Sequence, residues 1–144
     1  MRDIFFRGQT RRHGEKVFMN GEKVPSNWVY GGICQGTGDF SIIYGSMDVE
    51  LKAPTEKHTV YTDTVGQYTG LTDRNGVKIF EGDIVDILTE NEEIGVVTYD
   101  DGGFMVYADG FCVDFHTNIN GTDLEVIGNI YDTPELLDGM EARI

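Results

Sequence analysis

The sequence is poor in the residues that define several specialised classes of protein. It contains 3 prolines and 2 cysteines, Cys34 and Cys112, and neither cysteine belongs to a Cys-x-x-Cys pair. Two such isolated cysteines indicate free thiols rather than a disulfide framework or a paired-cysteine zinc site. No apolar run reaches the roughly 18 residues of a membrane-spanning helix, and the first residues lack the apolar stretch of a signal peptide. We therefore expect a cytoplasmic protein whose thiols stay reduced.

Basic residues are scarce in the second half of the chain. The net charge is −14, and residues 79–144 contain sixteen acids but a single base, Arg143. Residues 1–78 contain the other ten bases and nine acids, so they are nearly neutral. The acidic half repels nucleic acids and anionic membranes and attracts basic proteins. We therefore expect a basic protein as the partner, and neither nucleic acid nor membrane. The alternative, that the charge only maintains solubility, stays open.

Glycine, in contrast, is abundant. The 19 glycines are spread along the chain, which is typical of many turns between short strands. No stretch has the periodicity of a long amphipathic helix, so we predict an all-β fold with one short helical turn at residues 134–137. The predicted strands are residues 4–7, 17–19, 40–44, 47–51, 65–69, 83–89, 94–99, 104–108, 111–115 and 124–131.

The predicted turns and linkers divide the chain into two parts. We predict that Gly45-Ser46 forms the turn between the strands 40–44 and 47–51, and that residues Gly31 to Gly38 form a flexible loop. The polar segment from Lys52 to His58 contains a proline and indicates a linker. The predicted domains are therefore a β-rich amino-terminal part, residues 1–60, and a carboxyl-terminal domain, residues 65–137.

The clearest local pattern is a hairpin around Asp109-Gly110. Asp-Gly supplies the positive φ angles that a two-residue hairpin turn requires. This turn places three pairs on one face, which we predict to be buried: Ala108 with Phe111, Val106 with Val113, and Phe104 with Phe115. We interpret the reverse face as an ordinary solvent-exposed strand face, rather than metal ligands or an activated thiol; it carries Cys112, Asp114 and His116.

The stretch from Gln67 to Val85, QYTGLTDRNGVKIFEGDIV, resembles the signature of the YopX-like family, small proteins of unknown function encoded by phages and prophages. Residues 125–132 and 134–137 are similar to the family's carboxyl end. The resemblance implies an SH3-like β-barrel in the carboxyl-terminal domain and a smaller β-rich amino-terminal part. It implies no catalytic residues, no metal and no cofactor. Turns are predicted at the signature's three glycines: Gly70, Gly76 and Gly82.

Two hypotheses of function follow. In the first, the protein is a non-enzymatic phage or prophage accessory module that binds a basic host or phage protein in the host cytoplasm. Its predicted binding residues are acids in a loop, with an aromatic anchor: Glu90, Glu92 and Glu93, with Tyr99 or Tyr107. In the second, the protein is a small metal-dependent hydrolase that uses Asp114, His116 and the Glu81-Gly82-Asp83 turn. A homo-oligomer is compatible with both.

Overall fold

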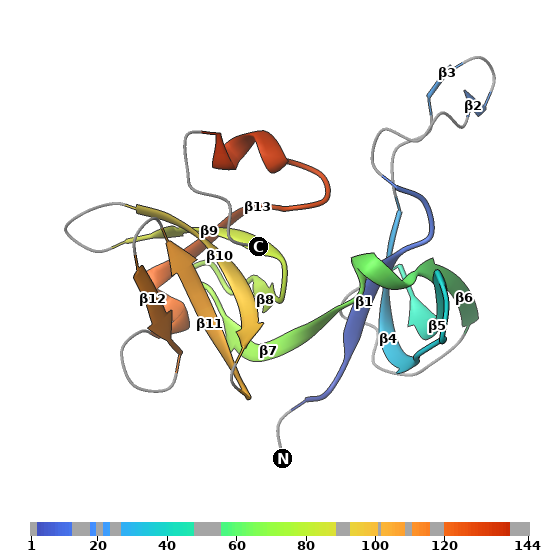
Figure 1. The fold of residues 1–144 in the computed structure, drawn as a ribbon, viewed down its shortest axis with the longest axis horizontal. Coiled ribbons are helices and arrows are strands. Elements are labelled where there is room, and N and C mark those ends of the chain that lie inside the picture. The colour runs from blue at the N-terminus through green and yellow to red at the C-terminus, as the bar shows by residue number, and fades with distance from the viewer. Residues whose placement is uncertain are drawn as a thin grey trace. The chain divides into compact units, whose positions relative to one another are not determined.

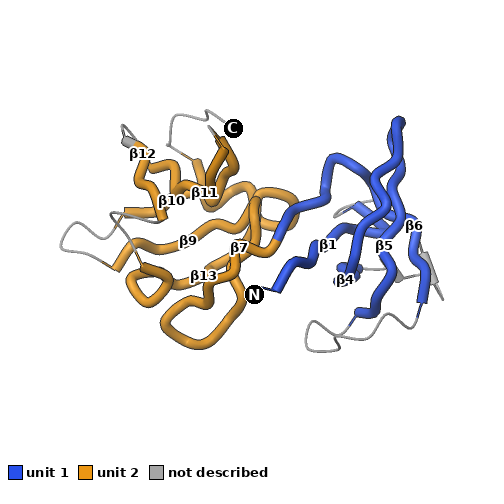
Figure 2. The backbone as a smooth tube through the Cα atoms, turned by 90° about the horizontal axis from the view of Figure 1, so that it is seen from below, with its two compact units in different colours: residues 1, 3–67 blue, residues 2, 68–144 orange. Residues whose placement is uncertain are grey.

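The fold is all-β, as predicted. The computed structural model describes residues 3–12, 18–19, 22–23, 27–47, 56–88, 93–100, 102–108, 111–115 and 120–138. These residues form strands and three short 3-10 turns, without an α-helix among them (Figure 1). No helix in this part of the chain is long and apolar enough to cross a membrane. The chain forms two compact units, Asp3–Gln67 and Tyr68–Ile144, which Figure 2 shows in separate colours.

The first unit is built on an antiparallel sheet with a small core. Its strands are β1 (Phe6–Gln9), β4 (Trp28–Cys34), β5 (Phe40–Ser46) and β6 (Glu56–Tyr61), in the order β6-β5-β4-β1. A separate pair is formed by β2 (Phe18–Met19) and β3 (Glu22–Lys23). Val29, Ile43 and Val60 are buried together and form the core of this unit.

The structure corrects two predictions about β4 and β5. Gly45-Ser46 is not a turn, because β5 continues through it and Gly45 pairs with Gly31 of β4. The predicted loop from Gly31 to Gly38 begins as strand, because β4 extends to Cys34. A Cβ atom built on Gly45 would overlap the carbonyl oxygen of Tyr30. The glycine therefore permits a close approach of two strands, where the sequence indicated a turn.

The linker prediction is also wrong in part. Residues 56–58 belong to β6, where His58 pairs with Ile43 of β5. Residues 52–55, and most of the predicted strand 47–51, lie outside the described residues. The polar composition misled the prediction because β6 alternates exposed polar residues with inward ones such as Val60.

Strand β7 (Gly66–Thr72) follows the 3-10 turn η1 (Thr62–Thr64) and crosses from the first unit into the second. Its first residues pair with β1, and its later residues pair with β8 (Lys78–Phe80). The predicted boundaries of two independent domains, residues 1–60 and 65–137, stay a prediction.

The second unit contains a five-stranded antiparallel sheet. Its strands are β9 (Asp83–Ile87), β10 (Glu93–Asp100), β11 (Gly103–Ala108), β12 (Phe111–Asp114) and β13 (Leu124–Asn129), in the order β12-β11-β10-β9-β13. The 3-10 turn η2 (Gly121–Asp123) precedes β13, and η3 (Pro134–Leu137) follows it at the predicted helical turn. Within the described strands, no pairing joins the outer strands β12 and β13, so the sheet is not a closed barrel.

The register of β11 and β12 confirms the predicted hairpin pairing. Ala108 pairs with Phe111 and Val106 pairs with Val113, and the N–H of Phe115 donates to the carbonyl of Phe104 at 3.5 Å. The inward face joins the main core, whose buried members include Val85, Val97, Val106, Phe104, Phe115 and Leu124. The turn itself, residues 109–110, lies outside the described residues.

Alternation of side chains gives the five-stranded sheet a core face and an opposite face, which we call the outer face. Four acids lie on the outer face, as the pairing registers show: Asp86, Asp100, Asp114 and Glu125. The five strands contain no lysine or arginine. Four of the six acids in these strands therefore share the outer face, which also carries the buried side chains of Ile84 and Val96.

Candidate functional site: a pocket at the end of β10

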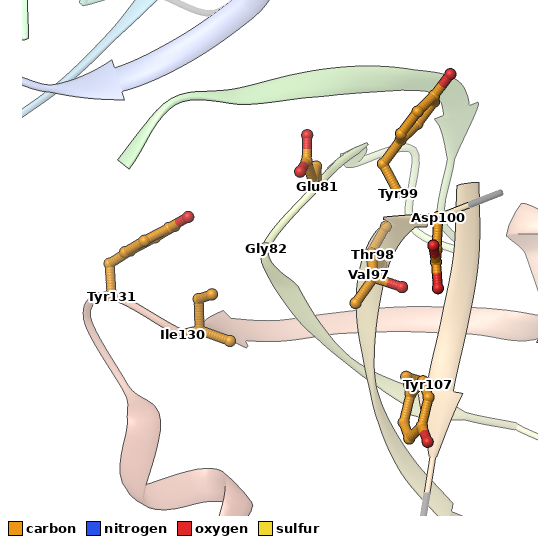
Figure 3. Close-up of a pocket in the computed structure, with 9 residues that line it drawn as sticks. All are labelled: Glu81, Gly82, Val97, Thr98, Tyr99, Asp100, Tyr107, Ile130 and Tyr131. Carbon is orange, nitrogen blue, oxygen red and sulfur yellow. The ribbon is translucent and has the colours of Figure 1, made fainter. Parts of the chain in front are cut away.

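A pocket of about 330 Å³ lies in the second unit, where β10 ends. Three segments line it, as Figure 3 shows. They are the turn at Glu81 and Gly82, the sheet residues 97–100 and Tyr107, and the pair Ile130 and Tyr131 that follows β13.

Backbone hydrogen bonds of Gly82 hold these segments together. Its N–H donates to the carbonyl of Val97 at 2.8 Å, and its carbonyl accepts the N–H of Ile130 at 2.9 Å. Gly82 has a φ of 92°, a conformation that favours glycine, which confirms it as a turn residue. The carboxylate of Asp83 accepts the N–H of Phe80 at 2.7 Å and closes the same turn. The turn predicted by the signature therefore forms one wall of the pocket.

A second turn, built on Asn129, positions Tyr131. The side-chain oxygen of Asn129 accepts the N–H groups of Tyr131 at 3.0 Å and of Asp132 at 2.9 Å. The N–H of Asn129 donates to Thr133 Oγ1 at 3.1 Å. Asparagine side chains commonly stabilise turns in this way. Tyr131 thereby extends from the end of β13 toward Gly82, as Figure 3 shows.

The two tyrosines of the β10–β11 pair lie on opposite faces of the sheet. Tyr107 pairs with Val96, so it shares the outer face with Thr98 and Asp100. Tyr99 pairs with Phe104 and packs edge-on against its ring, with the centroids 5.1 Å apart. In Figure 3, Tyr99 accordingly projects away from Asp100 and Tyr107.

The electrostatic environment beside the pocket is negative. Cys112 pairs with Tyr107 on the outer face. Partial burial raises the pKa of the Cys112 thiol, and the carboxylates of Asp100 and Asp114 raise it further. The same carboxylates disfavour an anion in this part of the outer face.

The structure brings only some of the predicted binding residues to the pocket. Tyr99 and Tyr107 both line it. Glu93 is not in a loop, because it begins β10 opposite Ile87 and is half-buried. Glu90 and Glu92 lie outside the described residues. Whether these residues bind a partner stays a prediction.

Two described residues of the hydrolase hypothesis, Asp83 and Asp114, lie on opposite faces of the five-stranded sheet. Asp83 is 1% exposed and lies on the core face, whereas Asp114 lies on the outer face. His116 lies outside the described residues. Over the ranges that the structure describes, no cluster of three or more His, Cys, Asp or Glu residues could hold a metal ion. Asp83 instead has a structural partner in the N–H of Phe80.

Sequence reasoning missed several pocket residues, among them Asp100 and Tyr131. The sheet face that carries Asp100 could have been predicted. Strand alternation and the register of the β10–β11 hairpin together place it on the same face as Tyr107. Tyr131 could not be placed in this way, because it follows the end of β13. Its position depends on the hydrogen bond between Ile130 and Gly82, which joins residues far apart in the sequence.

The fold and the pocket define a small all-β protein with a polar and aromatic pocket. A sequence profile described as "YopX protein" matches residues 33–138, and the chain belongs to this family, as the resemblance predicted. No curated protein matches the chain. Among solved structures, it is similar to the crystal structure of protein EF1440 from Enterococcus faecalis. That protein is 22% identical, the match covers 96% of this chain and 100% of that chain, and the TM-score is 0.47.

Proposed function

We propose that the second unit is a non-enzymatic protein-binding module whose acidic outer face recruits a basic protein. The observation that carries the proposal is the composition of the five strands, which contain six acids and no base. Four of these acids share the outer face. Their combined field attracts cationic partners and speeds their encounter.

A charged face controls the association rate more than the affinity, so a specific complex also needs an anchor. Tyr99 and Tyr107 are the aromatic candidates, because both line the pocket. Tyr99 is 53% exposed, so its ring is available to a partner. Glu90 and Glu92 stand next to Glu93 in the sequence and add to the charge before β10.

We also propose that the strand order of this unit is that of an SH3-like fold, with the sheet left open. Support comes from the four-stranded meander β9–β12, followed by η2 and then by β13 beside β9. Small barrels of this type often serve as recognition modules, although this argument is one of fold analogy. The resemblance to phage and prophage proteins supports an accessory role in the host cytoplasm.

The test is the salt dependence of binding to a defined basic probe, a peptide of alternating arginine and serine. The association rate should fall by about tenfold between about 50 and 500 mM salt, because screening shortens the reach of surface charges from above 10 Å to below 5 Å. The triple variant Asp86→Asn, Asp114→Asn and Glu125→Gln, which removes three charges from the outer face, should slow association by about fivefold at low salt.

The matched control changes the same number of charges in the first unit. It carries Asp3→Asn, Asp39→Asn and Glu56→Gln, three exposed acids of that unit. We expect this control to change the association rate by less than about twofold. Equal effects of the two triple variants, or a rate that stays flat with salt, would contradict the proposal.

A further inference from the structure

Strand β5 of the first unit displays a row of large apolar side chains on the face opposite the core. Phe40, Ile42 and Tyr44 alternate along the strand with the buried Ser41 and Ile43, so the three share one face. We call these three residues the β5 stripe. Phe40 is 53% exposed and Tyr44 is 44% exposed, and Ile42 between them is half-buried. Contiguous apolar surface of this kind often marks a contact with another molecule.

The neighbouring strands leave the β5 stripe accessible. Figure 1 shows β4, β5 and β6 side by side. Cys34 of β4 and Thr59 of β6 flank Ile42 on this face, and both are exposed. Gly32 of β4 pairs with Tyr44, and a Cβ atom built on Gly32 would meet nothing within 4 Å. The stripe therefore stands above its flanks, with open space beside Tyr44.

Phe40 is held in position by its neighbours. Its ring packs against that of Tyr61 on β6, with the centroids 5.1 Å apart. The guanidinium of Arg12 covers the Tyr61 ring at 4.1 Å and forms an ion pair with Asp63 at 2.9 Å. A side chain that is fixed before association loses less conformational entropy when a partner covers it.

The order of side chains along the stripe is self-complementary. One aromatic residue lies two positions before Ile42 and another lies two positions after it. A second copy turned by 180° about an axis across the strands, level with Ile42, presents the same order running in the opposite direction. We propose that the protein forms a two-fold homodimer in which the β5 stripes of two copies pack face to face and antiparallel. Phe40 of each copy then lies against Tyr44 of the other.

The charge of this region favours a second copy over the other occupants. Lys57 lies beside Tyr44 on the same face, and the ion pair of Arg12 and Asp63 lies at the Tyr61 end. Residues 1–78 likewise contain ten bases and nine acids. Two copies can meet here without the repulsion that the acidic outer face of the second unit would cause. A nucleic acid or a basic protein, in contrast, finds no field of one sign to attract it.

The size of the face predicts a weak dimer. Three strands of about seven residues cover roughly 14 by 23 Å at the usual spacings, so the two copies together bury on the order of 1,000 Å² of accessible surface. This area is at the low end for specific protein interfaces. We therefore expect a dissociation constant on the order of 100 µM. The inference concerns the first unit and does not rest on the proposed function.

The first experiment is sedimentation equilibrium of the full chain between about 10 and 500 µM, at about 150 mM salt to screen the net charge. Phe40→Ser and Tyr44→Ser should each weaken dimerisation by at least about tenfold, because a two-fold interface contains each residue twice. Circular dichroism verifies that each variant is folded. The matched control is Tyr99→Ser in the second unit. Tyr99 is also 53% exposed, and its ring packs against Phe104 at the same centroid distance of 5.1 Å. This control should change the dissociation constant by less than about twofold.

The second experiment uses the native thiols and needs no change in the stripe. The proposed axis passes level with the row of Cys34 and Ile42, so the two copies of Cys34 face each other. Packed sheets lie about 10 Å apart, a gap that a short bismaleimide can span. The Cys112→Ser variant, which retains Cys34, should form at least about fivefold more cross-linked dimer than the Cys34→Ser variant, which retains Cys112. Adding Phe40→Ser to the Cys112→Ser variant should abolish the difference.

Three results would overturn the proposed dimer. The first is a protein that stays monomeric up to about 500 µM. The second is a dimer that Phe40→Ser and Tyr99→Ser weaken equally. The third is cross-linking through Cys112 that is as efficient as cross-linking through Cys34. A concentration-dependent dimer that is lost in both stripe variants and cross-linked through Cys34 would establish it.

Discussion

Asp73 illustrates how single carboxylates organise the second unit. It is 3% exposed, and its Oδ1 accepts the N–H groups of Asn75 at 2.8 Å and Val77 at 2.9 Å. Its Oδ2 accepts the N–H of Val126 at 2.9 Å. The residue thus closes the turn of the family signature and attaches it to β13.

Replacing Asp73 with asparagine should destabilise the protein by about 1–3 kcal/mol. The amide oxygen of asparagine can still accept from Asn75 and Val77. The amide nitrogen, however, would face the N–H of Val126, so two donors would meet at a buried site. Urea unfolding followed by circular dichroism measures the loss. Glu135→Gln, at an exposed position of η3, is the control and should change stability by less than about 0.5 kcal/mol. Equal stabilities of the two variants would contradict this role of Asp73.

Cys112 should be a slow nucleophile. Its pKa is raised by partial burial and by Asp100 and Asp114, so less thiolate is present at neutral pH than for an ordinary thiol. In a Cys34→Ser variant, alkylation by iodoacetamide should be slower than in the urea-unfolded protein. Its rate should continue to rise with pH above about 8.5, where an ordinary thiol is half ionised.

Salt provides a second measurement of the same effect. Added salt should accelerate the alkylation of folded Cys112, because screening weakens the repulsion between its thiolate and the two carboxylates. The substitution Asp114→Asn should likewise accelerate the alkylation of folded Cys112, because it removes one of the two carboxylates. A folded rate that equals the unfolded rate, or that does not respond to salt, would show that the two carboxylates do not act on this thiol.

At the scale of elements, β4 and β5 depend on the absence of side chains where they pair. Gly31 and Gly45 lie opposite each other. Cβ atoms built on them would overlap backbone atoms of Tyr44 and Tyr30, respectively. Gly45→Ala should therefore cost about 1–3 kcal/mol, because the strands must separate to admit the methyl group.

Gly32 offers a matched control for this prediction. It lies in the same strand as Gly31, but a Cβ atom built on it would meet nothing within 4 Å. Gly32→Ala should leave the thermal unfolding midpoint nearly unchanged, or raise it slightly by restricting the unfolded chain. Similar losses from Gly32→Ala and Gly45→Ala would mean that strand propensity, rather than close approach, determines the effect.

The contrast between the hairpin β11–β12 and the pair β4–β5 shows what sequence reasoning can reach at this scale. The register of Ala108, Val106 and their partners followed from a local turn and strict alternation. In the sequence, the glycines of β4 and β5 cannot be distinguished from turn glycines. Glycine is needed at these positions because the neighbouring strand approaches closely. Only the pairing of Gly31 with Gly45 distinguishes the two meanings. The sequence likewise could not bring Tyr131 to β10, because that depends on tertiary hydrogen bonds.

For the whole molecule, the fragment 65–137 should fold without the preceding residues. The five strands and every member of the main core cluster lie within it. The core depends on pairings within the fragment, such as β13 with β9. Circular dichroism of the fragment should show β-structure, and heating should give a cooperative transition. The intact chain is the control, and a random-coil spectrum would refute the prediction of two independent domains.

The lack of any lysine or arginine in the five strands also affects how copies of the protein behave toward each other. Among the described strands, the outer strand β12 pairs only with β11, and an unpaired strand edge can pair with the edge of another molecule. Two copies that met in this way would bring Asp114 toward the carboxylate of the other copy, with no cation from this strand between them. Like charges across a strand pair are destabilising. The single sign of charge on these strands thus opposes edge-to-edge association of two copies.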